Sequence, residues 1–162
     1  GGGDDTGELT YGEDTYPTAT SGGRVWMAEN LRDKPAGAVE GTDMWPSQSG
    51  LSAGMLYNYA TATGGVSTTG GAPVQGICPA GWHLPTAAEF ESLIAAERPE
   101  GFLDYAGFRN ENGYGDSSRG YLLGGDPSCA DRVRCLSYSE DSAPVIKDML
   151  TGYYFPLRCV KD

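Results

Sequence analysis

The placement of four cysteines is the feature of this sequence that most constrains its fold. Cys78 opens the segment Cys78-Pro79-Ala80-Gly81-Trp82-His83-Leu84-Pro85-Thr86, and Cys159 stands near the end of the sequence, shortly before Asp162. If these two cysteines pair, one covalent bond ties the middle of the chain to its last residues. Such a pattern points to a compartment and to a fold, but it does not name a ligand.

Four cysteines allow three pairings, and we favour Cys78–Cys159 together with Cys129–Cys135. In the loop-entropy model the long loop contributes roughly 4–5 kcal/mol and the short one roughly 2 kcal/mol. The alternatives are four free thiols in a cytosolic protein, or a zinc site. Zinc is disfavoured because the sequence has no C-x-x-C motif and His83 is its only histidine. Two disulfides would indicate an oxidising compartment.

Length and composition set further limits. The chain has 162 residues, which is typical of one domain, and its 25 glycines and 10 prolines favour a loop-rich α+β structure. A net charge of −11 argues against nucleic acid as a partner and against anionic membrane surfaces. No apolar run approaches the roughly 20 residues that a transmembrane helix needs.

We interpret residues 1–15 as a flexible N-terminal linker and residues 16–162 as a single domain. The small, acidic start from Gly1 to Glu8 fits a chain whose secretory signal has been removed. It also fits the tether of a surface lipoprotein whose lipid-modified cysteine lies upstream of Gly1. The alternative is an artificial start of the chain.

The clearest local signal is the capping box Thr86-Ala87-Ala88-Glu89, which predicts an amphipathic helix over residues 87–97. We expect a short strand around Val25 and a strand that runs into a short helix over residues 54–62. Further strands are expected at residues 102–103, 121–123, 134–138 and 153–160. Of the three tryptophans, Trp45 lies in a Pro/Ser-rich loop and is the one expected to be exposed.

Several segments resemble the major paralogous domain family first named in Fibrobacter, which is abundant in secreted and lipid-anchored proteins of Bacteroides-type bacteria. The resemblance runs from about residue 16 to residue 162. It is carried by Val25-Trp26-Met27-Ala28-Glu29-Asn30-Leu31, Gly54-Met55-Leu56-Tyr57, the Cys78–Thr86 segment, and Val160-Lys161-Asp162.

The resemblance implies a C-type-lectin-like α+β fold, a group that also includes formylglycine-generating enzymes. Such a fold has two helices packed on small twisted antiparallel sheets with long irregular loops. A cysteine near a helix pairs with one in the last strand, and a second disulfide holds the loop region, in agreement with the pairing favoured above. Residues 120–125 depart from the aromatic-Trp-Ser-Ser strand usual in the family, so the second half is diverged.

We expect ligand recognition by loops at residues 104–118 and 126–142 and by the turn at Tyr153-Tyr154. Tyrosine combined with Asn, Asp, Arg and Gly is typical of adaptable binding surfaces, although ordinary packing is the alternative for each tyrosine. The candidate ligand-binding residues are Tyr105, Arg109, Asn110, Asn112, Tyr114, Asp116, Tyr138, Tyr153 and Tyr154.

Metal and cofactor signals are weak. Asn110, Glu111, Asn112 and Asp116 are oxygen ligands that miss the EF-hand pattern, and the calcium motifs of C-type lectins are absent. We therefore expect no cofactor and leave calcium as an open alternative. His83, between Trp82 and Leu84, is interpreted as a scaffold histidine rather than a catalytic base.

Together these observations predict a non-catalytic, extracellular binding or adhesion domain on a bacterial outer surface. Its partner would be a glycan or a protein on another cell or surface. One alternative is a structural subunit or spacer of a surface assembly. Another is an enzyme of the formylglycine-generating type, which would need a cleft with unpaired thiols.

Overall fold

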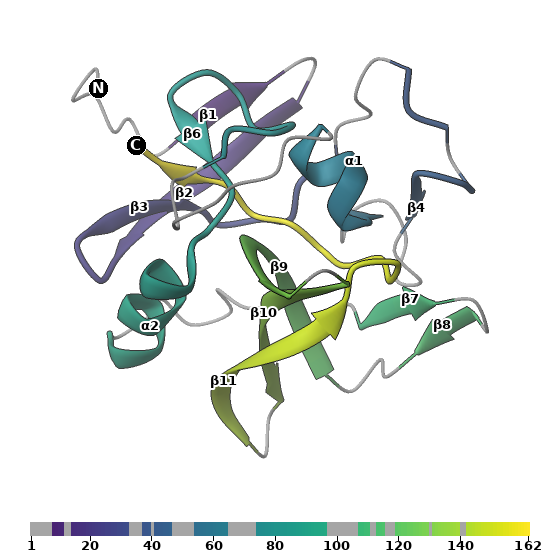
Figure 1. The fold of residues 1–162 in the computed structure, drawn as a ribbon. Helices are drawn as coiled ribbons and strands as arrows, with labels where there is room; N and C mark the ends of the chain where they lie inside the picture. Colours follow the sequence, from purple (N-terminus) through teal and green to yellow (C-terminus); the bar gives the residue numbers. More distant parts are fainter. Residues whose placement is uncertain are drawn as a thin grey trace.

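The computed structural model describes residues 8–11, 14–32, 37–39, 41–46, 54–64, 74–96, 107–110, 113–115, 119–129, 131–139 and 142–162. Within these ranges the chain is predominantly β-structure, with two short helices (Figure 1). The elements in chain order are β1 (Glu8–Tyr11), β2 (Asp14–Ser21), β3 (Arg24–Met27), β4 (Met44–Pro46), β5 (Met55–Tyr57), α1 (Tyr59–Thr63), β6 (Trp82–His83), α2 (Ala87–Ala95), β7 (Phe108–Asn110), β8 (Gly113–Gly115), β9 (Arg119–Cys129), β10 (Arg132–Ser139), β11 (Ser142–Leu150) and β12 (Val160–Lys161).

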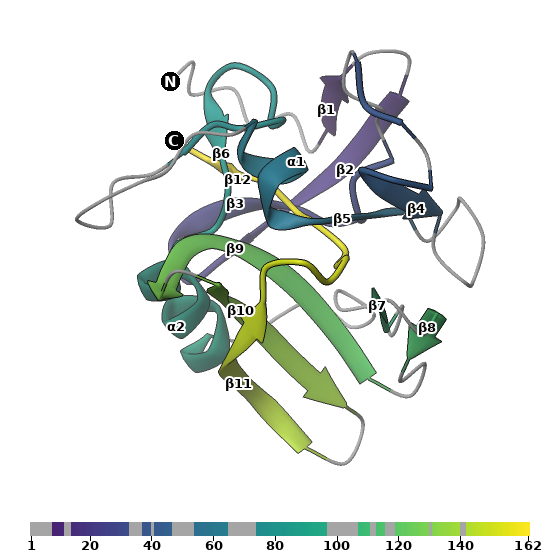
Figure 2. The ribbon, with the colours of Figure 1, turned by 45° about the vertical axis from the view of Figure 1, so that its right-hand side comes forward.

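The largest sheet has the strand order β1-β2-β3-β12-β6. Its C-terminal strand β12 is inserted between two earlier strands, since Val160 pairs with Trp26 of β3 on one side and with His83 of β6 on the other. Figure 2 shows β12 in this position. The predicted Cys78–Cys159 disulfide forms beside it, with an S–S distance of 2.10 Å. The last segment of the chain is thus held in the middle of the fold by both pairing and a covalent bond.

A second sheet consists of the long antiparallel strands β9, β10 and β11, which curl beneath the first (Figure 2). Helix α2 packs against this sheet, where Phe90 and Leu93 meet Leu122 and Leu136 in one apolar cluster. Trp26 of β3 joins the same cluster and stacks on Phe90 with ring centroids 6.1 Å apart. This packing connects the two sheets through the helix.

The capping-box prediction is confirmed at the start of α2. Thr86 accepts a hydrogen bond from the backbone of Glu89, and the Glu89 carboxylate accepts one from the backbone of Thr86. The predicted strand leading into a short helix is also confirmed as β5 followed by α1. Asn58 caps α1 with its side chain, and Gly64 ends it in the left-handed conformation at φ 68°.

Two small antiparallel pairs, β4–β5 and β7–β8, lie at the side of the molecule away from α2 (Figure 1). The segment that follows β11 joins them to the rest of the fold. It forms isolated bridges from Phe155 to Tyr57 and from Tyr154 to Arg109. Most of the strand predicted over residues 153–160 is therefore an extended connection, and only its end belongs to a sheet as β12.

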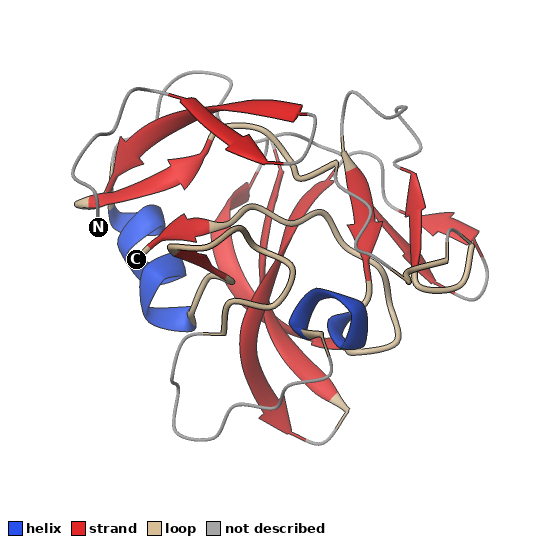
Figure 3. Cartoon of the chain, turned by 90° about the horizontal axis from the view of Figure 1, so that it is seen from above, coloured by secondary structure: helices blue, strands red, loops and turns tan. Residues whose placement is uncertain are grey.

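The expected C-type-lectin-like α+β class is wrong for this chain. The described residues form mostly strands, with a curled antiparallel sheet and several small sheets, and the helices are only 5 and 9 residues long. Figure 3 shows that the two helices stand apart, so they form no helical layer against a sheet. The high glycine and proline content predicts a loop-rich chain. In the structure, however, the strands β9, β10 and β11 occupy much of the second half.

The second predicted disulfide is also wrong: Cys129 and Cys135 are both free. Cys129 pairs with Arg132 across the β9–β10 hairpin, which places Cys135 three residues farther along β10. Three strand residues span about 10 Å, more than the roughly 7 Å between Cα atoms that a disulfide tolerates. Cys135 is buried in the core and Cys129 is exposed, so the two thiols also face different surroundings.

Strand β1 and the first residues of β2 fall within the segment expected to be a linker, so ordered structure is already present at Glu8. Residues 1–7 lie outside the described residues, as does the strand expected at 102–103. Neither of the described helices has the length and apolar character needed to cross a membrane.

Candidate functional site

A cavity of about 430 Å³ opens beside the small sheets, and we call it the aromatic pocket. It is formed by β4 and the loop before it, by β7, and by the end of β11 and the turn that follows. Its volume falls within the range of roughly 300–1,000 Å³ that is usual for small-molecule sites. The residues that line it are Gly41, Trp45, Arg109, Asn110, Asp131, Leu150, Thr151, Gly152, Tyr153 and Tyr154.

The backbone fixes the two sides of the aromatic pocket against each other. The amide of Arg109 donates to the carbonyl of Tyr154 at 3.0 Å, and the amide of Tyr154 donates to the carbonyl of Arg109 at 2.8 Å. On the neighbouring turn, the amide of Thr151 donates to the carbonyl of Asp131 at 2.9 Å. Residues far apart in the sequence are thereby held in register around one cavity.

Aromatic rings organise the side chains of this site. The guanidinium carbon of Arg109 lies 3.5 Å from the ring centroid of Trp45 and 4.7 Å from that of Tyr114. Trp45 in turn meets Tyr154 edge to face at 6.5 Å. Tyr153 stacks on Phe108, with ring centroids 5.5 Å apart and an interplanar angle of 7°. Such contacts give the cation a defined orientation.

Two tyrosine hydroxyls anchor these rings to β4, the strand that carries Trp45, and to the loop before it. Tyr154 donates to the carbonyl of Thr42 at 2.6 Å, and Tyr114 donates to the carbonyl of Pro46 at 2.7 Å. The rings therefore have both a fixed apolar body and a satisfied polar end. The pocket is a preassembled structure rather than a gap between loops.

Four of the nine predicted ligand-binding residues line the aromatic pocket: Arg109, Asn110, Tyr153 and Tyr154. Tyr114 does not line it but covers Arg109, and its side chain is 39% exposed. Tyr138 is only 2% exposed and belongs to the core cluster around α2, so it does not reach this surface. The remaining three, Tyr105, Asn112 and Asp116, lie outside the described residues.

Sequence reasoning missed the part of the pocket that comes from the first half of the chain. Trp45 was expected to be exposed and is partly so, but nothing in its Pro/Ser-rich surroundings indicated that Arg109 would stack on it. Gly41, in the loop before β4, was missed for the same reason, because no local pattern indicates that β4 and β7 lie side by side. In the second half Leu150 was also missed, whereas Asp131 falls within the segment 126–142 that was predicted to recognise a ligand.

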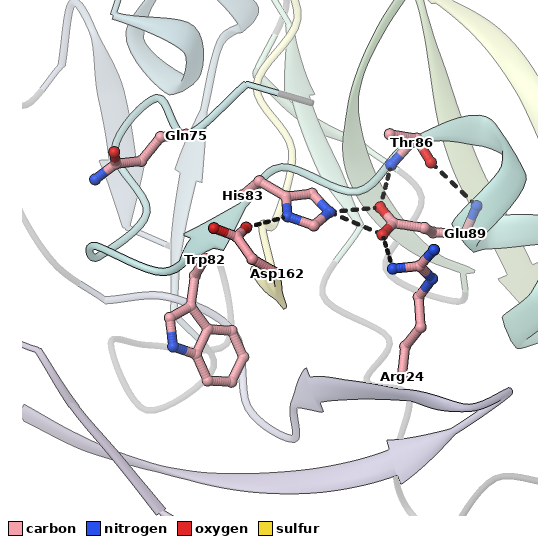
Figure 4. A pocket seen from close by; sticks show the side chains of 7 residues that line it. All are labelled: Arg24, Gln75, Trp82, His83, Thr86, Glu89 and Asp162. Carbon is pink, nitrogen blue, oxygen red and sulfur yellow. Dashed lines mark hydrogen bonds and ion pairs between the residues drawn. The ribbon is translucent and has the colours of Figure 1, made fainter. Parts of the chain in front are cut away.

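A second cavity of about 570 Å³ lies near β6 and the start of α2, and we call it the histidine pocket (Figure 4). It is lined by Arg24, Gln75, Trp82, His83, Thr86, Glu89 and Asp162. Nδ1 of His83 is 2.6 Å from Asp162, and Nε2 is 2.9 and 2.8 Å from the two carboxylate oxygens of Glu89. Arg24 also belongs to this cluster, because it forms an ion pair with Glu89 at 3.0 Å.

The electrostatics of the histidine pocket favour a charged pair. Burial alone would lower the pKa of His83, but hydrogen bonds and charge attraction from Glu89 and Asp162 outweigh it and raise that pKa above its ordinary value. Burial likewise would raise the pKa of Glu89, yet His83, the Thr86 backbone and Arg24 lower it. Both ring nitrogens of His83 are thus engaged with carboxylates, as expected of a scaffold histidine that links β6, α2 and the end of β12.

Chemical capability differs between the two pockets. In the histidine pocket, the side-chain partners of His83 among the described residues are the carboxylates of Glu89 and Asp162. The two free thiols do not share a site, because Cys135 is fully buried and its pKa is raised to about 12 by burial. The aromatic pocket offers ring surfaces, a guanidinium, an amide and a carboxylate, which are groups that can bind a polar ligand.

Metal binding has little support within the described ranges. They contain no group of three His, Cys, Asp or Glu side chains able to hold a metal ion. Of the oxygen ligands considered for calcium, Asn110 lies in the aromatic pocket, whereas Glu111, Asn112 and Asp116 are outside the described residues.

Comparison with protein families gives a match over most of the chain. A family model described as the Fibrobacter succinogenes major domain matches residues 20–131, which is more than half of the chain. That range includes the WMAENL and CPAGWHLPT motifs together with strands β3 to β9. Neither the curated proteins nor the solved structures include a match to this sequence.

Proposed function

We propose that this chain, which belongs to the Fibrobacter succinogenes major domain family, is a non-catalytic extracellular domain that binds a carbohydrate in the aromatic pocket. The Cys78–Cys159 disulfide supports an oxidising location. In this proposal the domain stands on a bacterial outer surface, attached through a lipid-modified cysteine upstream of Gly1. Protease treatment of intact cells that make the protein tests this location. A domain on the cell surface should be degraded while the cell membranes remain intact.

The observation that carries the proposal is the convergence of Trp45, Tyr153 and Tyr154 with Arg109 and Asn110 around one cavity. Sugars present apolar C–H faces and polar hydroxyl edges, so their sites combine ring surfaces with a few fixed polar groups. The aromatic pocket has both. Its rings are already held in place, Tyr154 by a hydrogen bond to the backbone and Trp45 and Tyr153 by ring contacts, which lowers the entropic cost of binding.

A flat protein interface fits this surface less well. Among the described residues, the exposed large hydrophobic side chains are Val39, Tyr114 and Val145, which stand on three different segments. Contiguous apolar patches of several hundred square ångströms usually mark protein docking faces, and scattered single residues do not. The concave aromatic pocket is therefore the better candidate for recognition.

A glycan array probed with the purified domain, with and without calcium, is the direct test. We expect specific binding that is lost in Trp45→Ala, because that change removes the central ring of the pocket. Val145→Ser is the matched control, since Val145 is exposed on β11 and does not line the pocket. An array without any bound glycan, in both conditions and for the folded domain, would overturn the proposal in favour of a protein partner or a spacer role.

A further inference from the structure

Of the residues that line the aromatic pocket, Arg109 is the basic one. Its guanidinium lies against the rings of Trp45 and Tyr114, at 3.5 and 4.7 Å. Within the described part of the chain it forms no ion pair with any carboxylate. A guanidinium whose faces meet aromatic rings still has N–H donors around its edge, in the plane of the group. Those donors are the natural binding groups for an anion that enters the aromatic pocket.

The position of Arg109 is fixed before any ligand arrives. Its backbone is bonded in both directions to Tyr154, and Tyr114 is tied by its hydroxyl to Pro46, next to Trp45. An arginine usually loses rotamer entropy when it binds an anion. Here the rings already restrict the side chain, so less entropy remains to be lost on binding.

Asp131 gives the aromatic pocket a second, opposite charge. It lines the cavity together with Arg109, yet the two side chains do not form an ion pair with each other. Its Oδ1 accepts a weak hydrogen bond from the Cys129 thiol at 3.3 Å. A carboxylate accepts hydrogen bonds from hydroxyl groups, whereas a guanidinium donates to a carboxylate. The cavity thus presents an anion site and a hydroxyl site apart from each other.

We propose that the aromatic pocket selects sugars that carry one carboxylate, with Arg109 binding the carboxylate and Asp131 accepting hydrogen bonds from sugar hydroxyls. This inference rests on the proposed carbohydrate function and specifies its ligand class. A charge-assisted pair between arginine and a carboxylate is the stronger kind of hydrogen bond, and its two parallel contacts add geometric selectivity. An uncharged sugar of the same shape would meet the same rings but would leave the guanidinium without a partner.

The overall charge limits the ligand to a single acidic group. The chain carries a net charge of −11, so a polyanionic glycan would be repelled by the rest of the domain. Arg109 provides one local cation, which suffices for one carboxylate. A terminal or isolated acidic sugar therefore fits better than a polysulfated or polyuronic chain.

Matched pairs of ligands test the inference on the intact domain. The probes are methyl glucuronide against methyl glucoside and galacturonic acid against galactose, with heparin as the polyanion. Titration is followed by calorimetry and by tryptophan fluorescence, whose ligand-dependent change is expected from Trp45 because it lines the aromatic pocket, whereas Trp26 and Trp82 do not. We expect the acidic member of at least one pair to bind about tenfold more tightly than its neutral partner.

Variants connect the preference to the residue. Arg109→Met should reduce the acidic-to-neutral ratio to about one, and Arg109→Lys should retain only part of it, because lysine lacks the planar fork. Arg134→Met is the matched control, since Arg134 is an exposed arginine of β10 that does not line the pocket. This control should keep the full preference.

The outcomes separate the two proposals. If both members of every pair bind equally, the acidic preference is overturned while carbohydrate binding stands. Tighter binding of heparin than of all single-carboxylate sugars would overturn the charge argument. Failure of every sugar to bind the folded domain would overturn the carbohydrate function itself, as would capture of a protein partner through the same pocket.

Discussion

Nε2 of His83 lies 2.8 Å from Oε2 of Glu89, and both side chains are almost completely buried. The histidine belongs to the CPAGWHLPT motif, and the glutamate is the third helical residue of the capping box that follows it. The two residues therefore form one unit, in which the motif fixes the start of α2 against β6. Asp162, 2.6 Å from the other ring nitrogen, adds the end of the chain to the same unit.

This cluster predicts that stability depends on pH in a defined direction. The pKa of His83 is raised above its usual 6.5, so its contribution is fully present below about pH 6.5 and is lost as pH rises through the folded-state value. The pKa of Glu89 is lowered below 4.5, so its contribution is present above about pH 4.5 and is lost as pH falls through its folded-state value. We expect the highest melting temperature between about pH 4.5 and 6.5, measured by scanning calorimetry.

A variant separates this effect from the general repulsion among acidic residues. His83→Gln should flatten the decline of the melting temperature on the alkaline side, because the titrating imidazole is gone. Lys147→Gln, at an exposed site on β11, should leave the slope unchanged. An alkaline slope of equal size in His83→Gln and in the parent would contradict the assignment to His83.

The two free cysteines should differ in their reactivity toward thiol reagents, because one is exposed and the other is buried. A thiol reagent added to the native protein should label Cys129 alone, since it is exposed. Cys135 should react only after unfolding, because it is buried and its pKa is raised to about 12. Mass spectrometry after labelling counts the products. Labelling of no cysteine in the unreduced, unfolded chain would show that Cys129 and Cys135 are bonded after all.

Removal of the disulfide should be costly. Cys78→Ala combined with Cys159→Ala opens a loop with a sequence separation of 81 residues. The loop-entropy model gives a loss of about 4 kcal/mol in the free energy of unfolding. Denaturant unfolding measures it, with Cys129→Ala as the control, which should stay within about 0.5 kcal/mol of the parent. A double variant as stable as that control would show that strand pairing alone holds the C-terminal segment.

The stretch that departs from the family pattern contains a glycine that the packing requires. A Cβ at Gly124 would collide with the carbonyl oxygen of Arg134 and would stand 2.9 Å from the ring of Phe90. We expect Gly124→Ala to destabilise the fold by about 3 kcal/mol, through overpacking between β9 and α2. At Gly152 a Cβ meets nothing within 4 Å, so Gly152→Ala should be nearly neutral in the same thermal denaturation experiment. Equal melting temperatures for the two variants would count against this packing.

Local signals in the sequence predicted local structure well. The capping box gave α2, the apolar run at residues 54–62 gave β5 and α1, and cysteine spacing gave the Cys78–Cys159 bond. In each case the cause lies within a few residues or in one strong covalent constraint. The family resemblance was confirmed for the same reason, since it rested on compact motifs.

Long-range pairing was the part that could not be predicted. The insertion of Val160 between Trp26 and His83 depends on three distant strands at once. The register of the β9–β10 hairpin separates Cys129 from Cys135. The second disulfide was predicted wrongly because this register cannot be inferred from the number of residues between the two cysteines. The aromatic pocket was half predicted, since Arg109 and Tyr154 were named while Trp45 approaches them from another strand.

Substitution of two tyrosines that were predicted to bind ligand should have opposite effects on stability and on sugar binding. Tyr114 is 39% exposed above Arg109, whereas Tyr138 is 2% exposed in the cluster around α2. Tyr114→Ala should therefore change the free energy of unfolding by only about 1–2 kcal/mol, the combined value of its hydrogen bond to Pro46 and its contact with Arg109, but should weaken sugar binding by freeing the guanidinium. Tyr138→Ala should cost about 3 kcal/mol or more in stability, because it empties part of the core. Sugar binding should be measured at a temperature at which both variants are folded, and it should then be weakened only in Tyr114→Ala. If it is weakened only in Tyr138→Ala, the binding site does not lie in the aromatic pocket.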